Sequence, residues 1–300
     1  MTAPIVYEHP IFRPPSEANS LLIQLTIGCS NNKCTYCDMY RSKTYRVRSI
    51  LEISQDLQNA VTYYQTIAMA PQKIFLCDGD ALGAPMELLT ETLDLINATF
   101  PSIRRIGVYA TAENILSKSV EELKLLASKK LSIAYLGLES GDDKVLHMIV
   151  KGNTAHDMLQ ASLKIKNCGF KLSTIAMLGV GGQKFSKQHV ENTAKILSET
   201  SPHFFSFLTT FAVPGTPYKT MIDRGLIAPL TSKELLQEMH DIIDLAEFSE
   251  NSIIFRANHV SNMHPLAGVL PKDKMTILKN IRGWIEQTPP GVYPTPPIQM

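Results

Sequence analysis

The amino-acid sequence predicts an α/β fold, a partial (β/α)6 barrel of the TIM type with a carboxyl-terminal extension. Short apolar runs rich in β-formers alternate regularly with longer amphipathic segments, and parallel strands need such helical crossovers between them. Polar residues directly follow almost every predicted strand. Functional residues at the carboxyl ends of all strands are typical of a barrel, whereas a doubly wound sheet concentrates them in one crevice. The polar strand ends therefore favour the barrel.

The predicted barrel consists of six strand–helix units. We expect strands at residues 21–27, 74–77, 105–109, 133–138, 171–178 and 204–211. We expect helices at residues 50–69, 87–98, 120–129, 154–168, 187–199 and 231–248. Capping residues mark several of the helix starts, because Ser49, Ser119 and Thr231 each stand directly before an amphipathic run.

The chain is expected to have three parts. Residues 1–20 form a lead-in, residues 21–220 the barrel, and residues 221–300 the extension. In the extension we expect a short strand at 252–255 and a helix at 272–286. Five prolines follow Thr288, so the tail is predicted to be extended or disordered.

Composition and charge indicate a soluble globular protein. Of the 300 residues, 44% are hydrophobic and 19% are charged, and the formal net charge is +1. So small a charge does not indicate nucleic-acid binding. No apolar run approaches the ~20 residues that a membrane span needs, and the amino terminus lacks a signal-peptide pattern. The five cysteines, three of them clustered, suit a reducing compartment, so we expect a cytoplasmic protein with no membrane partner.

Three cysteines lie within nine residues, at Cys29, Cys34 and Cys37, in a C-x4-C-x2-C pattern. They follow a predicted strand and stand beside glycine, serine and two asparagines. Thiolates are soft ligands that suit the iron of an iron–sulfur cluster. Such a cluster would then have three protein ligands and one iron open for chemistry.

Two other metal sites fit the same cysteines. A zinc site would need a fourth ligand, which His259 or Asp38 would have to supply. Plant-type [2Fe–2S] ferredoxins have the same spacing followed by a distant fourth cysteine, and Cys77 would take that place. Such ferredoxins are small β-rich proteins, however, whereas these cysteines stand in a series of strand–helix units.

The cysteine loop resembles the cluster-binding motif of the radical S-adenosylmethionine (SAM) superfamily. An aromatic residue often precedes the third cysteine in that family, as Tyr36 does here. The commoner family spacing is C-x3-C-x2-C, and this chain has one extra residue between Cys29 and Cys34. The resemblance implies one [4Fe–4S] cluster held by the thiolates of Cys29, Cys34 and Cys37. It also implies that the remaining iron binds the amino and carboxylate groups of SAM.

Later strand ends fit this resemblance in chain order, over residues 21–217. Asp78, Gly79 and Asp80 stand where the family has a Gly-Gly-Glu type segment that binds the methionine ammonium group of SAM. They keep a tight turn rich in hydrogen-bond acceptors. The alternative is a strand-to-helix turn with an aspartate as cap.

Three further strand ends complete the predicted cofactor contacts. Thr111 or Asn114 is expected to point into the mouth of the barrel. Glu139 and Ser140 resemble the polar residues that contact the ribose hydroxyls or the carboxylate of SAM in this family, although they also suit a helix cap. Gly179 permits close approach of the backbone to a flat ligand, here the adenine, or simply tight packing.

The predicted substrate-side residues are Arg256, His259 and Asn262, in a polar run after a predicted strand. An arginine would hold a carboxylate with two hydrogen bonds, and a histidine would transfer a proton. The alternative is a surface loop whose side chains cap one another. The basic residues 41–48 are predicted to be a solvated flank of the cysteine loop, with an anionic substrate or an acidic electron donor as the alternative partner.

The resemblance implies an enzyme, an oxidoreductase or transferase that cleaves SAM reductively at its cluster. The product would be a 5′-deoxyadenosyl radical that acts on an unidentified substrate, and an external donor such as flavodoxin or ferredoxin would supply the electron. The alternative is a non-catalytic iron–sulfur electron carrier with Cys77 as fourth ligand. A third interpretation is a binding module stabilised by zinc.

Overall fold

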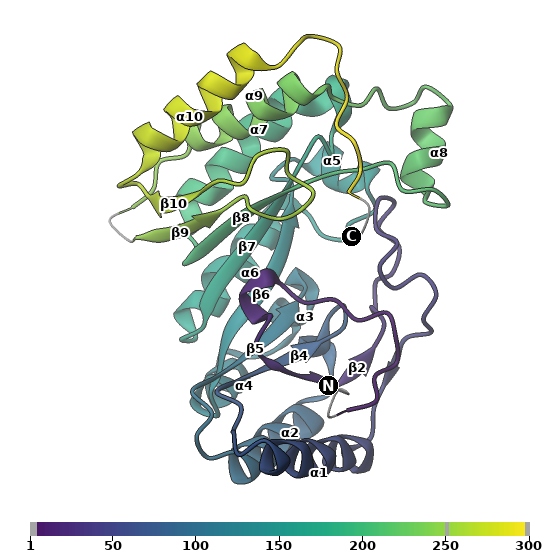
Figure 1. Cartoon of the computed structure of the whole chain (residues 1–300), viewed down its shortest axis with the longest axis vertical. Coiled ribbons are helices and arrows are strands. Elements are labelled where there is room, and N and C mark those ends of the chain that lie inside the picture. The colour runs from purple at the N-terminus through teal and green to yellow at the C-terminus, as the bar shows by residue number, and fades with distance from the viewer. Residues whose placement is uncertain (1–4, 250–251, 298–300) are drawn as a thin grey trace. The chain divides into compact units, whose positions relative to one another are not determined.

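The computed structural model describes residues 5–249 and 252–297 and has an α/β fold (Figure 1). A small antiparallel pair joins β2 (Thr26–Ile27) to β3 (Arg46–Val47). The main sheet consists, in spatial order, of β1 (Leu21–Gln24), β4 (Lys73–Cys77), β5 (Arg105–Ala110), β6 (Leu131–Glu139), β7 (Lys171–Leu178), β8 (Phe204–Thr209), β9 (Ile253–Arg256) and β10 (Ala267–Leu270).

Pairing in the main sheet is mostly parallel, as expected for strands joined by helices. The pairs β1–β4, β4–β5, β5–β6, β7–β8 and β8–β9 are parallel, whereas β10 runs antiparallel to β9. The order begins at β1 and ends at β10, and in the described part of the chain no pairing between these two strands closes a barrel. The prediction of an α/β fold with an incomplete barrel is confirmed.

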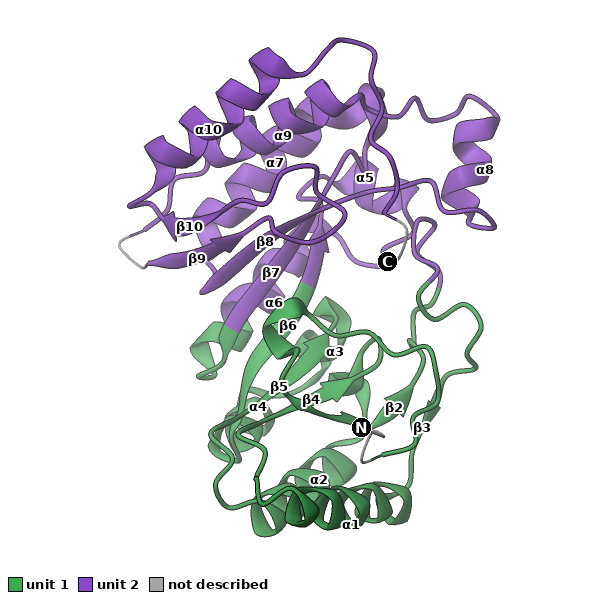
Figure 2. Ribbon diagram, viewed as in Figure 1, with its two compact units in different colours: residues 1–32, 39–136, 164–171 green, residues 33–38, 137–163, 172–300 purple. Residues whose placement is uncertain are grey.

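The chain folds into two compact units (Figure 2). Unit 1 consists of residues 1–32, 39–136 and 164–171, and unit 2 of residues 33–38, 137–163 and 172–300. The boundary passes through the cysteine loop, so Cys29 belongs to unit 1, whereas Cys34 and Cys37 belong to unit 2. It also passes through β6 and through α6 (Ala155–Asn167).

Unit 1 places amphipathic helices beside buried strands. The residues of α1 that are buried include Ile53, Leu57 and Ala60, whose spacing forms one apolar stripe, and α1 packs beside α2. The last four residues of β4 are all fully buried. The helices of this unit are α1 (Ile50–Thr66), α2 (Met86–Thr99), α3 (Ala112–Ser117), α4 (Val120–Ser128) and two short 3-10 helices, η1 (Pro15–Glu17) and η2 (Ala81–Gly83).

Unit 2 has its own apolar core. The rings of Phe205, Phe207 and Phe255, from β8 and β9, lie with their centroids 4.6 to 5.9 Å apart. Helix α9 packs against both α7 and α10. The helices of this unit are α5 (Asp143–Met148), α7 (Gly182–Thr200), α8 (Pro217–Asp223), α9 (Ser232–Leu245) and α10 (Lys274–Gln287).

The predicted elements are all present, with two kinds of difference. The first predicted strand is interrupted at Leu25 and forms β1 and β2. The helices α3, α5 and α8 and the strands β3 and β10 were not predicted. The predicted caps are confirmed, because Ser49, Ser119 and Thr231 each form a capping box with the glutamate three residues later. The tail has no helix or strand over residues 288–297, and its last three residues lie outside the described part.

Candidate functional site

Cys29 opens the cysteine loop in unit 1, directly after β2 and Gly28. Gly28 has a φ of +77°, which glycine adopts without strain, and its carbonyl accepts a hydrogen bond from the Gly79 N–H at 2.9 Å. A Cβ built on Gly79 would lie 2.4 Å from Cys29 Cβ and 2.9 Å from its Sγ. The backbone that follows β4 therefore packs directly against the first cysteine.

Gly79→Ala is expected to displace Cys29 and lower the stability of unit 1 by roughly 1–3 kcal/mol, the usual cost of overpacking, because the new methyl group would overlap the cysteine. Urea unfolding measures the free energy, and iron content after reconstitution measures the effect on the loop. The control is Gly283→Ala in α10, where a Cβ meets nothing within 4 Å. Equal iron content in both variants would contradict the expectation.

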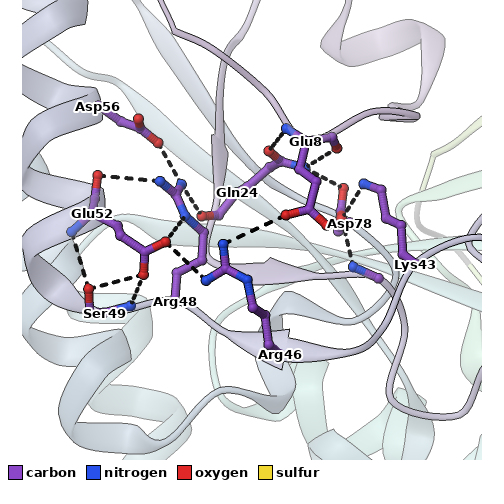
Figure 3. A network of polar contacts seen from close by, with 10 residues as sticks. Glu8, Gln24, Lys43, Arg46, Arg48, Ser49, Glu52, Asp56 and Asp78 are labelled. Carbon is purple, nitrogen blue, oxygen red and sulfur yellow. Dashed lines mark hydrogen bonds and ion pairs between the residues drawn. The ribbon is translucent and has the colours of Figure 1, made fainter.

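Asp78, the first residue after β4, fastens the start of the cysteine loop (Figure 3). Its Oδ2 lies 2.7 Å from Lys43 Nζ and accepts the Gly28 N–H at 2.8 Å, and Oδ1 accepts from Gln24 Nε2 at 3.2 Å. The side chains of Asp78 and Lys43 are 0% and 2% exposed, so they form a buried ion pair. The predicted contact of Asp78 with the ammonium group of SAM stays a prediction, and the structure gives this carboxylate three protein donors.

Asp80 binds the next part of the same loop. Its carboxylate accepts hydrogen bonds from the Ser30 N–H at 3.2 Å, from the Ser30 hydroxyl, and from Asn114 Nδ2 at 3.3 Å. Burial raises the pKa of Asp80. The Thr111 hydroxyl accepts the Asn114 N–H at 3.2 Å and caps α3. The structure thus brings Asp80 and Asn114 together and gives Thr111 a capping role.

The basic stretch beside the cysteine loop is paired within unit 1 (Figure 3). Arg48 Nη1 lies 2.5 Å from Asp56 and 2.8 Å from the Gln24 carbonyl oxygen. Arg46 Nη1 lies 3.0 Å from Glu52. The prediction of a solvated flank is wrong for Lys43 and Arg48, whose side chains are only 2% and 11% exposed, because buried carboxylates on neighbouring elements attract them inward.

Thr35 anchors the part of the cysteine loop that belongs to unit 2. Its N–H donates to the Ile149 carbonyl at 2.8 Å, and its carbonyl accepts the Tyr218 N–H at 3.1 Å. The Cys37 N–H donates to the Cys34 carbonyl at 3.3 Å, which turns the chain between them. Both cysteines are half-buried, and these backbone hydrogen bonds hold the turn that carries them.

Tyr36 is linked to the end of β6. Burial and the nearby Glu139 carboxylate raise the pKa of the Tyr36 phenol well above its ordinary value. Glu139 Oε1 accepts from Lys151 Nζ at 2.8 Å. The glutamate has a φ of +60° and folds back over Gly137, whose Cβ would lie 2.2 Å from Oε1. The carboxylate predicted to contact SAM therefore stands in a partly buried ion pair.

Ser140 and Asp142 lie in the turn between β6 and α5, and Ser140 contacts α7. Asp142 Oδ1 accepts the first N–H groups of α5 and caps that helix, the role that was the alternative for Glu139. The Ser140 hydroxyl lies 2.8 Å from His189 Nδ1. Among the described residues His189 Nε2 has no hydrogen-bond partner, although the ring is fully buried. Burial lowers the pKa of His189 to about 4, so this imidazole is neutral at neutral pH.

Gly179 follows β7 and is held on both sides of its backbone. Its N–H donates to Glu238 Oε2 at 2.6 Å, and its carbonyl lies 3.1 Å from the Tyr218 hydroxyl. The Ser186 hydroxyl donates to Glu238 Oε1 at 2.6 Å. Gly179 has a φ of +76°. Since protein groups use both its N–H and its carbonyl, it would contribute shape rather than hydrogen bonds to the predicted adenine site.

Glu238→Gln is expected to remove a pH dependence of stability. Burial raises the pKa of Glu238 to about 7, so the folded state binds this proton more tightly than the unfolded state does. Its contribution to stability is fully present below pH ~4.5 and is lost as pH rises through ~7, a change on the order of 3 kcal/mol. Glutamine keeps an acceptor for Gly179 but has no such proton.

Urea unfolding at pH 5 and pH 8 measures this difference. The variant should gain stability relative to the wild-type protein at the higher pH, and Glu191→Gln, whose parent side chain is 54% exposed, should not. The opposite titration of His189 is common to all three proteins and cancels in the comparison. A parallel pH profile for wild type and Glu238→Gln would contradict the prediction.

The predicted substrate-side residues lie on and after β9. Asn262 Nδ2 donates to the Phe207 carbonyl at 2.7 Å, and the Arg256 guanidinium donates to the Phe255 carbonyl at 2.7 Å. His259 Nδ1 accepts the Ser261 N–H at 3.2 Å, and burial lowers its pKa. These bonds are those of a loop that caps itself and β8. A role in substrate binding stays a prediction.

The remaining cysteines are buried. Cys77 is fully buried in β4, and burial raises the pKa of its thiol. Cys168 is also buried, with its Sγ 3.8 Å from the Val120 carbonyl oxygen. Over residues 5–249 and 252–297, no three His, Cys, Asp or Glu side chains are grouped so as to hold one metal ion. None of the helices in these ranges combines the length and apolar character that a membrane span needs.

Three residues that contact the predicted site residues were missed by reasoning from the sequence: Lys151, Tyr218 and Glu238. Lys43 lies in the basic stretch that the sequence singled out, but its buried pair with Asp78 was not predicted. Glu238 left a signal, because it lies on the buried face of α9 with Leu235 and residues 239 and 242, where an acid is unusual. Lys151 and Tyr218 are single residues distant in sequence from their partners, and no pattern identifies them.

Comparison with known proteins connects these features to one family. A model of the radical SAM superfamily matches residues 23–197, more than half of the chain. The heme chaperone HemW of Bacillus subtilis is 22% identical over 214 residues, which cover 70% of this chain and 55% of the relative. A tRNA-2-methylthio-N(6)-dimethylallyladenosine synthase of Cronobacter sakazakii is 24% identical over 218 residues, covering 70% and 44%. The chain thus spans about half the length of these curated relatives.

Solved structures agree on the fold. Methylornithine synthase (PylB) matches with a TM-score of 0.53 and 14% identity, over 92% of this chain and 82% of that chain. At this identity the likeness shows a shared fold and no more.

Proposed function

Because this chain belongs to the radical SAM superfamily, whose members bind a [4Fe–4S] cluster and SAM, we propose that it is a radical SAM enzyme with one cluster on Cys29, Cys34 and Cys37. The observation that carries the proposal is the three-cysteine loop inside the matched residues 23–197. When bound, the cluster and SAM would supply the redox chemistry: one electron from an external donor would cleave SAM reductively to methionine and a 5′-deoxyadenosyl radical, which would act on the substrate.

The chemistry of the donor residues fits such a cluster, in which each thiolate would bind a separate iron. The donor set is three cysteine thiols, none of them fully buried, and thiolates are the protein ligands that iron–sulfur clusters use. Protein hydrogen bonds hold the backbone on both sides, at Gly28 in unit 1 and at Thr35 in unit 2. Cys77 is a poor candidate for a ligand, because its thiol is fully buried in β4 and burial raises its pKa.

Other residues of the site have assigned roles toward SAM in this proposal. Asp80 and the tight backbone at Gly79 would receive the ammonium group of SAM. Glu139 would accept hydrogen bonds from the ribose hydroxyls, and Lys151, which it orients at 2.8 Å, would face the SAM carboxylate. Gly179 would allow the adenine to lie against the backbone. An external donor such as flavodoxin or ferredoxin would deliver the electron.

The named relatives do not indicate a common substrate for this chain. One is named a heme chaperone and the other a tRNA-modifying synthase, so the two names point to unrelated molecules. Arg256, His259 and Asn262 remain the proposed substrate side of unit 2.

Anaerobic reconstitution with iron and sulfide tests the proposal. We expect a brown protein with about four irons per chain that yields 5′-deoxyadenosine and methionine when SAM and dithionite are added. Omission of the reductant is the control, and it should give neither product. A protein that holds a full cluster and leaves SAM intact would contradict the enzymatic function, and a protein that binds no cluster would contradict the site as well.

A further inference from the structure

One buried side chain of unit 2 contacts two segments that the proposed function uses separately. Tyr218 lies in α8 and is 2% exposed. Its N–H donates to the carbonyl of Thr35, which stands between Cys34 and Cys37. Its hydroxyl lies 3.1 Å from the carbonyl oxygens of both Gly179 and Val180. A single residue therefore joins the cysteine loop to residues 179–181 after β7, called the glycine turn below.

Both joined segments have little freedom of their own. Thr35 is bound on its other side through its N–H to the Ile149 carbonyl at 2.8 Å. Gly179 is bound on its other side through its N–H to Glu238 at 2.6 Å. Each segment is thus fastened to the body of unit 2 at one group and to Tyr218 at another, so Tyr218 fixes the spacing between them.

The local sequence holds Tyr218 in place. Its helix begins at Pro217, whose ring presets φ for a first helical residue. The Thr216 hydroxyl caps the helix by accepting the Lys219 N–H at 3.3 Å, and Gly215 before it has a φ of +84°. The turn at 213–217, which contains proline and glycine, therefore fixes the start of α8. The phenol of Tyr218 lies in the first turn of this helix and is fixed with it.

We propose that Tyr218 is a positioning residue that sets the affinity of the protein for SAM by fixing the glycine turn relative to the segment that carries Cys34 and Cys37. This inference rests on the proposed function. SAM would contact the cluster at one end and the glycine turn at the other, so a change in their spacing weakens its binding. Tyr218 touches neither the cluster thiols nor the reacting atoms in this role.

Tyr218→Phe tests the inference, because it removes the hydroxyl and keeps the ring and the N–H bond to Thr35. We expect the Kd for SAM, measured by equilibrium dialysis on the oxidised, cluster-loaded protein, to rise roughly five- to tenfold, as the loss of one hydrogen bond implies. Iron content and the visible spectrum without SAM should be unchanged. In turnover, KM for SAM should rise while kcat at saturating SAM stays the same.

The matched control is Tyr7→Phe in unit 1, which also removes a phenol that donates to a backbone carbonyl, that of Leu22 at 3.0 Å. It should leave the Kd for SAM unchanged. Urea unfolding of both variants separates a loss of stability from a loss of binding. Equal SAM affinity in Tyr218→Phe and wild type would overturn the inference and leave the proposed function standing, whereas a wild-type protein that binds no SAM would overturn the proposed function itself.

Discussion

Cys34→Ala is expected to abolish the iron–sulfur cluster and, with it, all reductive cleavage of SAM above background. Two thiolates in place of three leave the cluster short of protein ligands, and alanine offers no donor. The Thr35 backbone bonds that shape this part of the loop involve no sulfur, so the fold should persist. Iron and sulfide content, visible absorbance and 5′-deoxyadenosine formation after anaerobic reconstitution measure the outcome.

Two cysteine variants serve as controls. Cys168→Ala removes a buried thiol at the end of α6 and should keep a full cluster. Cys77→Ala should also keep a full cluster if three cysteines suffice. Loss of iron from the Cys77→Ala variant would instead favour an electron carrier with four cysteine ligands. Full iron content in Cys34→Ala would remove the basis of the proposed site.

Asp78→Ala is expected to lower the stability of unit 1 by about 3–5 kcal/mol, the usual cost of removing one partner of a buried ion pair. The change strands the Lys43 ammonium in a buried position and leaves the Gly28 N–H without its acceptor. Urea unfolding measures the loss. The variant should also take up less iron, because the start of the cysteine loop is no longer fastened.

The double variant Asp78→Ala/Lys43→Met distinguishes a stranded charge from a lost contact. It should recover part of the stability, because the methionine is apolar and needs no partner. Asp94→Ala is the surface control, since its carboxylate pairs with Lys129 but is 59% exposed, and it should cost less than about 1 kcal/mol. A loss of similar size at both aspartates would contradict the buried-pair explanation.

Hydrophobic periodicity predicted the fold well because most elements are long enough to show a period. The strand at 171–178 was predicted with its observed bounds, and the capping boxes of α1, α4 and α9 marked their starts correctly. The helices α3, α5 and α8 have only six or seven residues, which is too short for an amphipathic pattern. Their starts follow local caps, Thr111, Asp142 and Thr216, that are also common in turns.

The sequence predicts a candidate site only where the residues that carry its chemistry are close together in the chain. The three cysteines indicate a soft-metal site by residue type and spacing. The Asp78–Lys43 pair joins residues 35 positions apart, and Glu238 meets Gly179 across 59 positions. Such contacts follow from tertiary packing, which a single sequence does not display.

The bonds that hold the start of the cysteine loop have a consequence for the response of this protein to oxygen. The bonds at its start run through carboxylate, ammonium and amide groups of Asp78, Lys43, Gln24 and Gly28, none of which oxygen attacks as it attacks an exposed cluster. Metal sites that order only when filled must refold to be repaired. In this protein we expect the start of the cysteine loop to keep its backbone conformation after oxidative loss of the cluster. Repair would then need only the insertion of iron and sulfide, without refolding of this part of the loop.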